Sequence, residues 1–252
     1  TDGEVDIAKL KPRGKEMRKI SGKDIAMIFQ DPMTSLHPTL KVGSQIIEAI
    51  RLHQGLTKQE ARKEAIKMLG RVGIAAPESR VDAYPHEMSG GMRQRVMIAM
   101  ALSCNPSLLI ADEPTTALDV TIEAQIMELL KYLKQESNMA VMFITHDLKV
   151  IGDMSKHQRS KAAALLSLIA AVDDIFYDAK HPYTSALLNA IPTIGQKSRL
   201  QNIPGTVPAL NELPEGCNFS PRCPHAMEIC RHHPPNISAI PAQQHREDGP
   251  HQ

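Results

Sequence analysis

The sequence predicts an α/β fold built on a mostly parallel, buried sheet. Three short apolar segments have the length of buried strands, at 25–29, 108–111 and 140–144. Helical segments separate them, at 42–53, after Thr57, at 92–103 and at about 121–136. Because apolar strands that alternate with helices are typical of parallel sheets, this pattern predicts the fold class.

The helix after Thr57 carries the most specific local signals. Thr57 is a good N-cap, and Glu60 follows three residues later, which is the spacing of a capping box. Gly73 is predicted to end this helix. Its apolar residues share one face: Ala61, Ala65, Met68, Leu69 and Val72.

Length and charge limit the class of protein. With 252 residues the chain holds one large α/β domain, or one domain with an appendage. Lys and Arg number 29 against 28 Asp and Glu, and Trp is absent, so we expect no nucleic-acid partner. No apolar run approaches the roughly 20 residues of a membrane span. The N-terminus lacks the apolar core of a signal peptide, so a cytosolic location is expected.

Two adjacent carboxylates end the second apolar segment. Asp112 and Glu113 follow four apolar residues, at the edge where open parallel sheets bind ligands. Asp112 is placed to hold a metal ion, most simply Mg²⁺. Glu113 is placed to orient or deprotonate a water that attacks a phosphate. The alternative is a strand end with solvated acids, and the longer pattern ADEPTTALD argues against it.

Four motifs resemble those of ABC ATPases, in the order found in that family. ADEPTTALD at 111–119 resembles the Walker B strand and D-loop, and IFQDP at 28–32 resembles the Q-loop. THD at 145–147 resembles the H-loop. MSGGMRQR at 88–95 resembles the ABC signature and departs from the commoner LSGGQ in its two methionines. The resemblance implies an ABC-type nucleotide-binding domain that uses ATP and Mg²⁺, with a helical subdomain at about 36–105.

The signature residues are predicted to form an anion site. Ser89, Gly90 and Gly91 open a helix, whose free N–H groups and dipole attract negative charge. In the family, this site covers the γ-phosphate held by the opposite subunit of a head-to-tail dimer. Asp119 of the D-loop is also expected to contact the nucleotide. The alternative for the signature is a Gly-rich helix cap without a ligand.

Gln30 and His146 each follow an apolar strand and complete the predicted catalytic set with Glu113. The Gln30 amide is placed to reach Mg²⁺ or the attacking water, and in the family its loop couples the ATPase to the membrane subunits. His146 is placed to donate a hydrogen bond to a γ-phosphate. The alternatives are a turn glutamine and a structural histidine. Arg93 and Arg95 add charge to the anion site, or one of them lies on a solvated face.

The phosphate-binding motif G-x-x-x-x-G-K-[ST] does not occur in residues 1–252. The family places this P-loop upstream of the segment that begins here. We therefore expect an incomplete nucleotide-binding domain, truncated before the P-loop. The chain alone is expected to bind ATP weakly and not to turn it over.

The C-terminal third narrows the resemblance to the peptide and nickel uptake group. Residues 173–192 resemble the segment that follows the ATPase core in oligopeptide and dipeptide importers, and residues 203–230 resemble their loop-rich extension. We expect a partial ATPase domain at 1–180 and the extension at 181–252. The implied partners are a second ATPase, membrane permeases and, indirectly, a substrate-binding protein. The chain would lie at the cytoplasmic face of the membrane.

Three cysteines cluster in this extension with C-x5-C-x6-C spacing: Cys217, Cys223 and Cys230. Some members of the group carry an iron–sulfur cluster on such cysteines and a fourth one. No cysteine follows Cys230 in this sequence. A histidine would complete the cluster, or the site would hold Zn²⁺, and the candidates are His225, His232, His233 and His245. The alternative is three reduced cysteines in a small loop-rich domain.

Residues 155–172 depart from the family pattern, which has a strand, a turn and another strand there. The segment AAALLSLIAA at 162–171 favours a helix. One hypothesis is a pair of compensating frameshifts, which the nucleotide sequence would test.

The sequence leaves two other functions open for this chain. A non-catalytic or regulatory remnant is favoured by the missing P-loop, whereas an ABC protein acting on DNA or ribosomes is disfavoured by the tail and the near-neutral charge.

Overall fold

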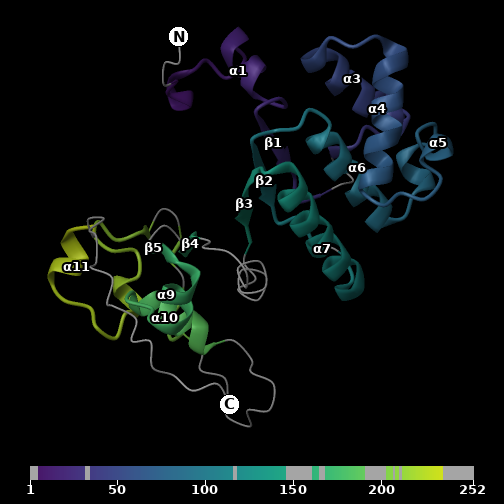
Figure 1. The fold of residues 1–252 in the computed structure, drawn as a ribbon. Helices are drawn as coiled ribbons and strands as arrows, with labels where there is room; N and C mark the ends of the chain where they lie inside the picture. Colours follow the sequence, from purple (N-terminus) through teal and green to yellow (C-terminus); the bar gives the residue numbers. More distant parts are fainter. Residues whose placement is uncertain are drawn as a thin grey trace. The chain divides into compact units, whose positions relative to one another are not determined.

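The computed structural model describes residues 5–31, 35–115, 118–145, 161–164, 168–190, 203–206, 208–209 and 212–234. Contacts divide the chain into two compact units, Thr1–Val150 and Ile151–Gln252. Figure 1 shows the elements of both units. The boundary predicted after residue 180 falls within the second unit and stays a prediction.

A parallel sheet of three strands forms the centre of the first unit. The strands are β1 (Ile25–Ile28), β2 (Leu108–Asp112) and β3 (Ala140–Ile144), in the order β1-β2-β3. Both pairings are parallel. This confirms the predicted α/β class, and it brings the carboxyl ends of all three strands to one edge.

The two faces of this sheet differ in burial. Every second residue of β1 and β2 is buried, and Ile28 and Leu109 are fully buried. Helix α6 (Gly90–Leu102) packs against β1, and buried residues of α7 (Val120–Ser137) join the same core. The other face of β3 is half-exposed at Met142 and Ile144. The core that fixes the strand ends therefore lies on the helix-covered face.

Two of the remaining helices of the first unit contact α6, and a third, short helix contacts α4. They are α3 (Val42–Gln54) and α4 (Lys58–Arg71), which contact each other, and the short α5 (Pro77–Arg80). Helix α4 also contacts α6 (Figure 1). These helices lie within the predicted subdomain at 36–105. The shorter elements of this unit are η1 (Ile7–Lys9), α1 (Lys15–Ile20) and η2 (Pro85–Glu87).

The capping box of α4 is confirmed. The Thr57 hydroxyl accepts from the backbone amide of Glu60 at 3.4 Å, and the Glu60 carboxylate accepts from the Thr57 amide at 2.9 Å. The helix ends at Arg71, and Gly73 has the positive φ of 78° that stops it. The five apolar residues predicted to share one face are all buried: Ala61, Ala65, Met68, Leu69 and Val72.

Thr57→Ala should lower the free energy of unfolding by about 1 kcal/mol, because it leaves the Glu60 amide without its cap. Urea unfolding followed by circular dichroism measures the change. Thr39→Ala is the matched control, since the exposed Thr39 hydroxyl caps no helix and, among the described residues, hydrogen-bonds with the His37 ring at 3.1 Å. Equal losses in the two variants would contradict a capping contribution.

The second unit contains a short antiparallel pair, β4 (Lys161–Ala164) and β5 (Leu168–Ala171). The helical preference predicted for 162–171 is therefore wrong. Helix propensities differ by less than about 1 kcal/mol per residue among ordinary side chains, and strand pairing outweighs them. A strand pair is also what the family pattern implies at this position. The frameshift hypothesis stays a prediction.

Short helices complete the second unit: α9 (Val172–Tyr177), α10 (Pro182–Asn189), η4 (Ser220–Arg222) and α11 (Ile229–His232). Phe219, just before η4, is buried and meets the Tyr183 ring edge-on, with the ring centroids 5.0 Å apart. This aromatic contact joins α10 to the segment that leads into η4. In the described part of the chain, no helix has the length and apolar character needed to cross a bilayer.

Candidate functional site: the carboxyl edge of the sheet and the start of helix α6

Two predicted catalytic residues meet at the carboxyl edge of the sheet. The side-chain amide of Gln30 donates to Glu113 Oε2 at 2.8 Å, although the residues are 83 positions apart. Gln30 follows β1, and Glu113 follows β2, its neighbour. The parallel pairing thus brings the Q-loop glutamine and the Walker B glutamate together. His146 lies outside the described residues.

The backbone at Glu113 is in the left-handed region, with φ of 43°. Its amide nevertheless donates to the carbonyl oxygen of Ile144 at 2.8 Å, which extends the β2–β3 ladder by one bond. A non-glycine residue in this region costs about 1–2 kcal/mol, and such conformations cluster at functional sites. The turn redirects the chain directly after Asp112, so the two adjacent acids do not continue the strand's alternation.

The donor set at this edge fits a magnesium ion. Asp112 is the half-buried last residue of β2, and its carboxylate forms no hydrogen bond or ion pair with the described residues. Two carboxylates and the amide oxygen of Gln30 are the oxygen ligands that Mg²⁺ prefers. Protein sites usually give Mg²⁺ only one or two carboxylates and leave the other positions to water and phosphate. Asp112 and Gln30 therefore suit a Mg²⁺–nucleotide complex.

The predicted anion site lies at the start of α6. Ser89 is the N-cap, and its hydroxyl accepts from the Met92 amide at 3.3 Å. A Cβ on Gly90 would meet no atom within 4 Å, whereas a Cβ on Gly91 would lie 2.9 Å from Ile122 Cγ2 on α7. The structure therefore needs glycine at these two positions for different reasons. Gly91 permits close packing of α6 on α7, and Gly90 leaves an open surface at the helix start.

Gln94 was missed by the sequence interpretation. Its side chain is 1% exposed, and its amide donates to the Pro114 carbonyl oxygen at 2.5 Å. Pro114 directly follows Glu113, so this bond joins the signature helix to the turn that carries the predicted catalytic base. A polar residue among the buried positions of α6 was the available signal.

Arg95 has a structural role rather than a free charge. Its guanidinium donates to the Val72 carbonyl oxygen at 2.6 Å and to Gln125 Oε1 at 3.3 Å. These bonds cap the end of α4 and join it to α7. A side chain at Gly73 would collide with this guanidinium, since a Cβ would lie 2.9 Å from it. Arg95 therefore fits neither alternative given above, because it is occupied with packing.

Asp119 is the N-cap of α7. Its carboxylate accepts from the Ile122 amide at 3.0 Å. Nearby, the Thr115 hydroxyl donates to the Glu123 carboxylate at 2.9 Å. These bonds fix the start of α7 behind the Walker B turn. The nucleotide contact assigned to Asp119 stays a prediction beside this capping role.

The metal site predicted at the three C-terminal cysteines is not supported. Cys217, Cys223 and Cys230 are free, half-buried thiols. The Cys217 amide donates to the Cys230 carbonyl oxygen at 2.8 Å, while Cys223 lines a separate pocket. Within the described residues, no group of three or more His, Cys, Asp or Glu side chains could hold a metal ion. Among the residues that the structure describes, the spacing of these cysteines therefore does not produce a converging ligand set.

Comparisons with known proteins agree with this geometry. The family model described as "ABC transporter" matches residues 1–116, and "Oligopeptide/dipeptide transporter, C-terminal region" matches residues 169–230. A dimeric, post-hydrolysis ATP-binding cassette, MJ0796 bound to ADP and Pi, is similar with a TM-score of 0.50 and 34% identity. The similarity covers 58% of this chain and 61% of that one. The fold is thus the α/β nucleotide-binding fold of ABC transporters.

Two curated relatives are more similar in sequence. The dipeptide transport ATP-binding protein DppD of Escherichia coli is 52% identical over 227 residues, which are 90% of this chain and 69% of that protein. The oligopeptide transport ATP-binding protein OppD of Salmonella typhimurium is 51% identical over 222 residues, 88% of this chain and 66% of that protein. The chain belongs to the family of ATP-binding proteins of oligopeptide and dipeptide ABC transporters.

Proposed function

We propose that this chain is the ATP-binding subunit that powers import of dipeptides or oligopeptides across a membrane. The observation that carries the proposal is the hydrogen bond between Gln30 and Glu113 beside Asp112, at the edge where a nucleotide-binding sheet acts. The printed names of DppD and OppD support peptides as the transported class. ATP and Mg²⁺ are the proposed cofactors.

Each side chain at the carboxyl edge of the sheet would have a separate role in ATP hydrolysis. Asp112 and Gln30 would hold Mg²⁺, which supplies charge neutralisation at the phosphates when bound. Glu113 would orient the attacking water and accept its proton. The amide of Gln30 steadies the Glu113 carboxylate in the structure, at 2.8 Å. His146 would donate a hydrogen bond to the terminal phosphate.

The start of α6 would serve a neighbouring subunit. Ser89 and Gly90 would cover the terminal phosphate of ATP bound to a second ATPase in a head-to-tail dimer. Support comes from the open surface at Gly90 and from the similar cassette, whose structure is dimeric. Further proposed partners are two membrane permeases and, through them, a substrate-binding protein. The chain would then lie at the cytoplasmic face of the membrane.

Residues 1–252 alone should bind ATP weakly and not hydrolyse it, because the sequence contains no G-x-x-x-x-G-K-[ST] loop. Calorimetric titration of the purified chain with Mg²⁺–ATP measures the affinity, and phosphate release measures turnover. The positive control is an ABC cassette that carries the motif. A micromolar dissociation constant for this chain would contradict the expectation.

Reconstitution tests the transport function. The chain is combined with its second ATPase and permeases in vesicles, and ATP-dependent uptake of a labelled dipeptide is measured. Uptake that needs this chain supports the proposal. The missing loop favours one alternative, a non-catalytic or regulatory remnant. Uptake that is unchanged when this chain is left out would favour the remnant and reject the proposed function.

A further inference from the structure

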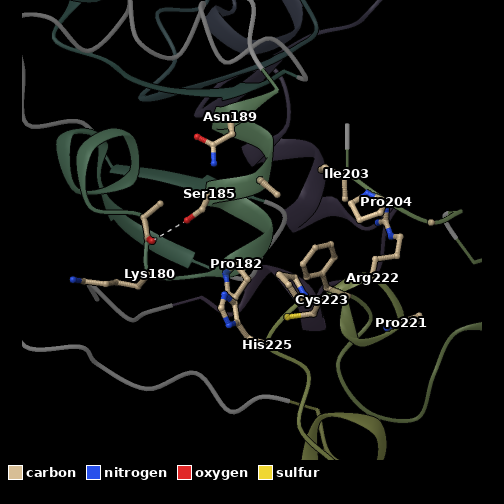
Figure 2. Close-up of a pocket in the computed structure, with 15 residues that line it drawn as sticks. Lys180, Pro182, Ser185, Asn189, Ile203, Pro204, Pro221, Arg222, Cys223 and His225 are labelled. Atoms are coloured by element: carbon tan, nitrogen blue, oxygen red, sulfur yellow. Dashed lines mark hydrogen bonds between the residues drawn. The ribbon is translucent and has the colours of Figure 1, made fainter. Parts of the chain in front are cut away.

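A pocket of about 720 Å³ lies in the second unit, between α10, residues 203–205 and residues 219–225. Figure 2 shows Ser185 and Asn189 along α10, with Arg222 across the pocket beside Pro204. The volume lies in the range of small-molecule sites, roughly 300–1,000 Å³. The pocket is far larger than a single inorganic ion needs.

The charged residues among the described lining of this pocket are basic. They are Lys180, Arg222 and His225, and the part of the lining that the structure describes contains no aspartate or glutamate. Lys180 pairs with Asp178 at 2.7 Å, outside the lining. A concave site with basic groups and no acid concentrates anions.

Arg222 is the least satisfied of these groups. Its side chain is held between the Phe219 ring, 5.4 Å from the guanidinium carbon, and Gly205, where a Cβ would lie 3.0 Å from Arg222 Cγ. The Arg222 guanidinium donates no hydrogen bond to the described residues, and its buried Nε has no hydrogen-bond partner among them. A half-buried guanidinium without an acceptor is costly, and a bound oxyanion would remove that cost.

The rest of the lining is mostly apolar and rigid. Phe219 and Ile203 contribute apolar side chains, and four prolines restrain the backbone around them. Pro182, Pro204, Pro221 and Pro224 are these prolines. Such walls offer contact area to the body of an organic ligand, which inorganic phosphate would not fill.

We propose that this pocket binds a small organic carboxylate, with the carboxylate on the guanidinium of Arg222 and an apolar body against Phe219 and Ile203. The site is separate from the nucleotide chemistry and does not depend on the proposed transport function. It makes the C-terminal extension a ligand-binding module.

Methyl NMR of the full chain tests the proposal with three probes. N-acetylphenylalanine should shift the Ile203 methyl signal and leave that of Ile46, in the core of the first unit, unchanged. N-acetylphenylalaninamide, which lacks the charge, should bind at least about tenfold more weakly. Inorganic phosphate, which lacks the apolar body, should also bind more weakly. An unmoved Ile203 signal at about 10 mM probe, or equal affinity for the amide, would overturn the site. Equal affinity for phosphate would overturn the organic ligand.

Substitutions of single residues test whether Arg222 contacts the bound carboxylate. Arg222→Gln should weaken binding of N-acetylphenylalanine about tenfold or more, because a charged hydrogen bond is lost. Arg231→Gln is the control, since Arg231 is exposed and outside the lining. The signal of buried Ile175 reports whether the unit stays folded. If Arg222→Gln unfolds it, Arg222→Lys carries the test, and weaker binding is expected because the two-pronged guanidinium contact is lost. Unchanged affinity in the folded variants would reject the proposal.

Discussion

Gly43→Ala should lower the free energy of unfolding by about 3 kcal/mol, at the upper end of what overpacking costs. A Cβ at Gly43 would lie 2.3 Å from Val81 Cγ2 and 2.5 Å from the Val81 carbonyl oxygen. That carbonyl also accepts from the Gly43 amide at 2.8 Å, so the backbones cannot separate without breaking the bond. Urea unfolding monitored by circular dichroism measures the loss.

Gly70→Ala is the matched control for this prediction, since both glycines lie inside helices. At Gly70 the nearest atom to an added Cβ is Pro77 Cγ, at 3.9 Å, an ordinary contact. Replacing a helical glycine without a collision should raise stability by about 0.5–1 kcal/mol. If Gly43→Ala proved as stable as Gly70→Ala, the close approach of α3 to Val81 would be refuted.

Gly90→Val should reduce ATP turnover of the reconstituted transporter by about 100-fold, the scale of a misplaced reacting group. The added side chain would occupy the open surface at the start of α6, where the terminal phosphate of the neighbouring subunit is proposed to lie. Stability should change little, because a Cβ at Gly90 meets no atom within 4 Å. Phosphate release and urea unfolding are measured on the same variant.

Gly70→Ala again serves as the control, with turnover expected to match the unmodified transporter. Two results would count against the proposed role of Gly90. One is unchanged turnover in Gly90→Val. The other is a stability loss as large as that of Gly43→Ala, which would make the effect one of folding.

Much of the first unit was predictable because its signals are local or periodic. The capping box needs only Thr57 and Glu60, three positions apart. The strands at 25–28 and 108–112 are short apolar segments between helices, and acids at the end of such a strand indicate a ligand edge. The sequence alone therefore determined the fold class and the family. It also predicted that Gln30 and Glu113 would act together.

Other features depend on partners far along the chain. Whether Gly90 or Gly91 is needed for packing is decided by Ile122, and the role of Arg95 is decided by Val72 and Gln125. No local pattern encodes those neighbours. The strand pair β4–β5 overrode the helical preference of its alanines and leucines, because pairing energies are set by the partner strand. Only the tertiary structure decided these points, since contact distances and hydrogen-bond partners arise from packing.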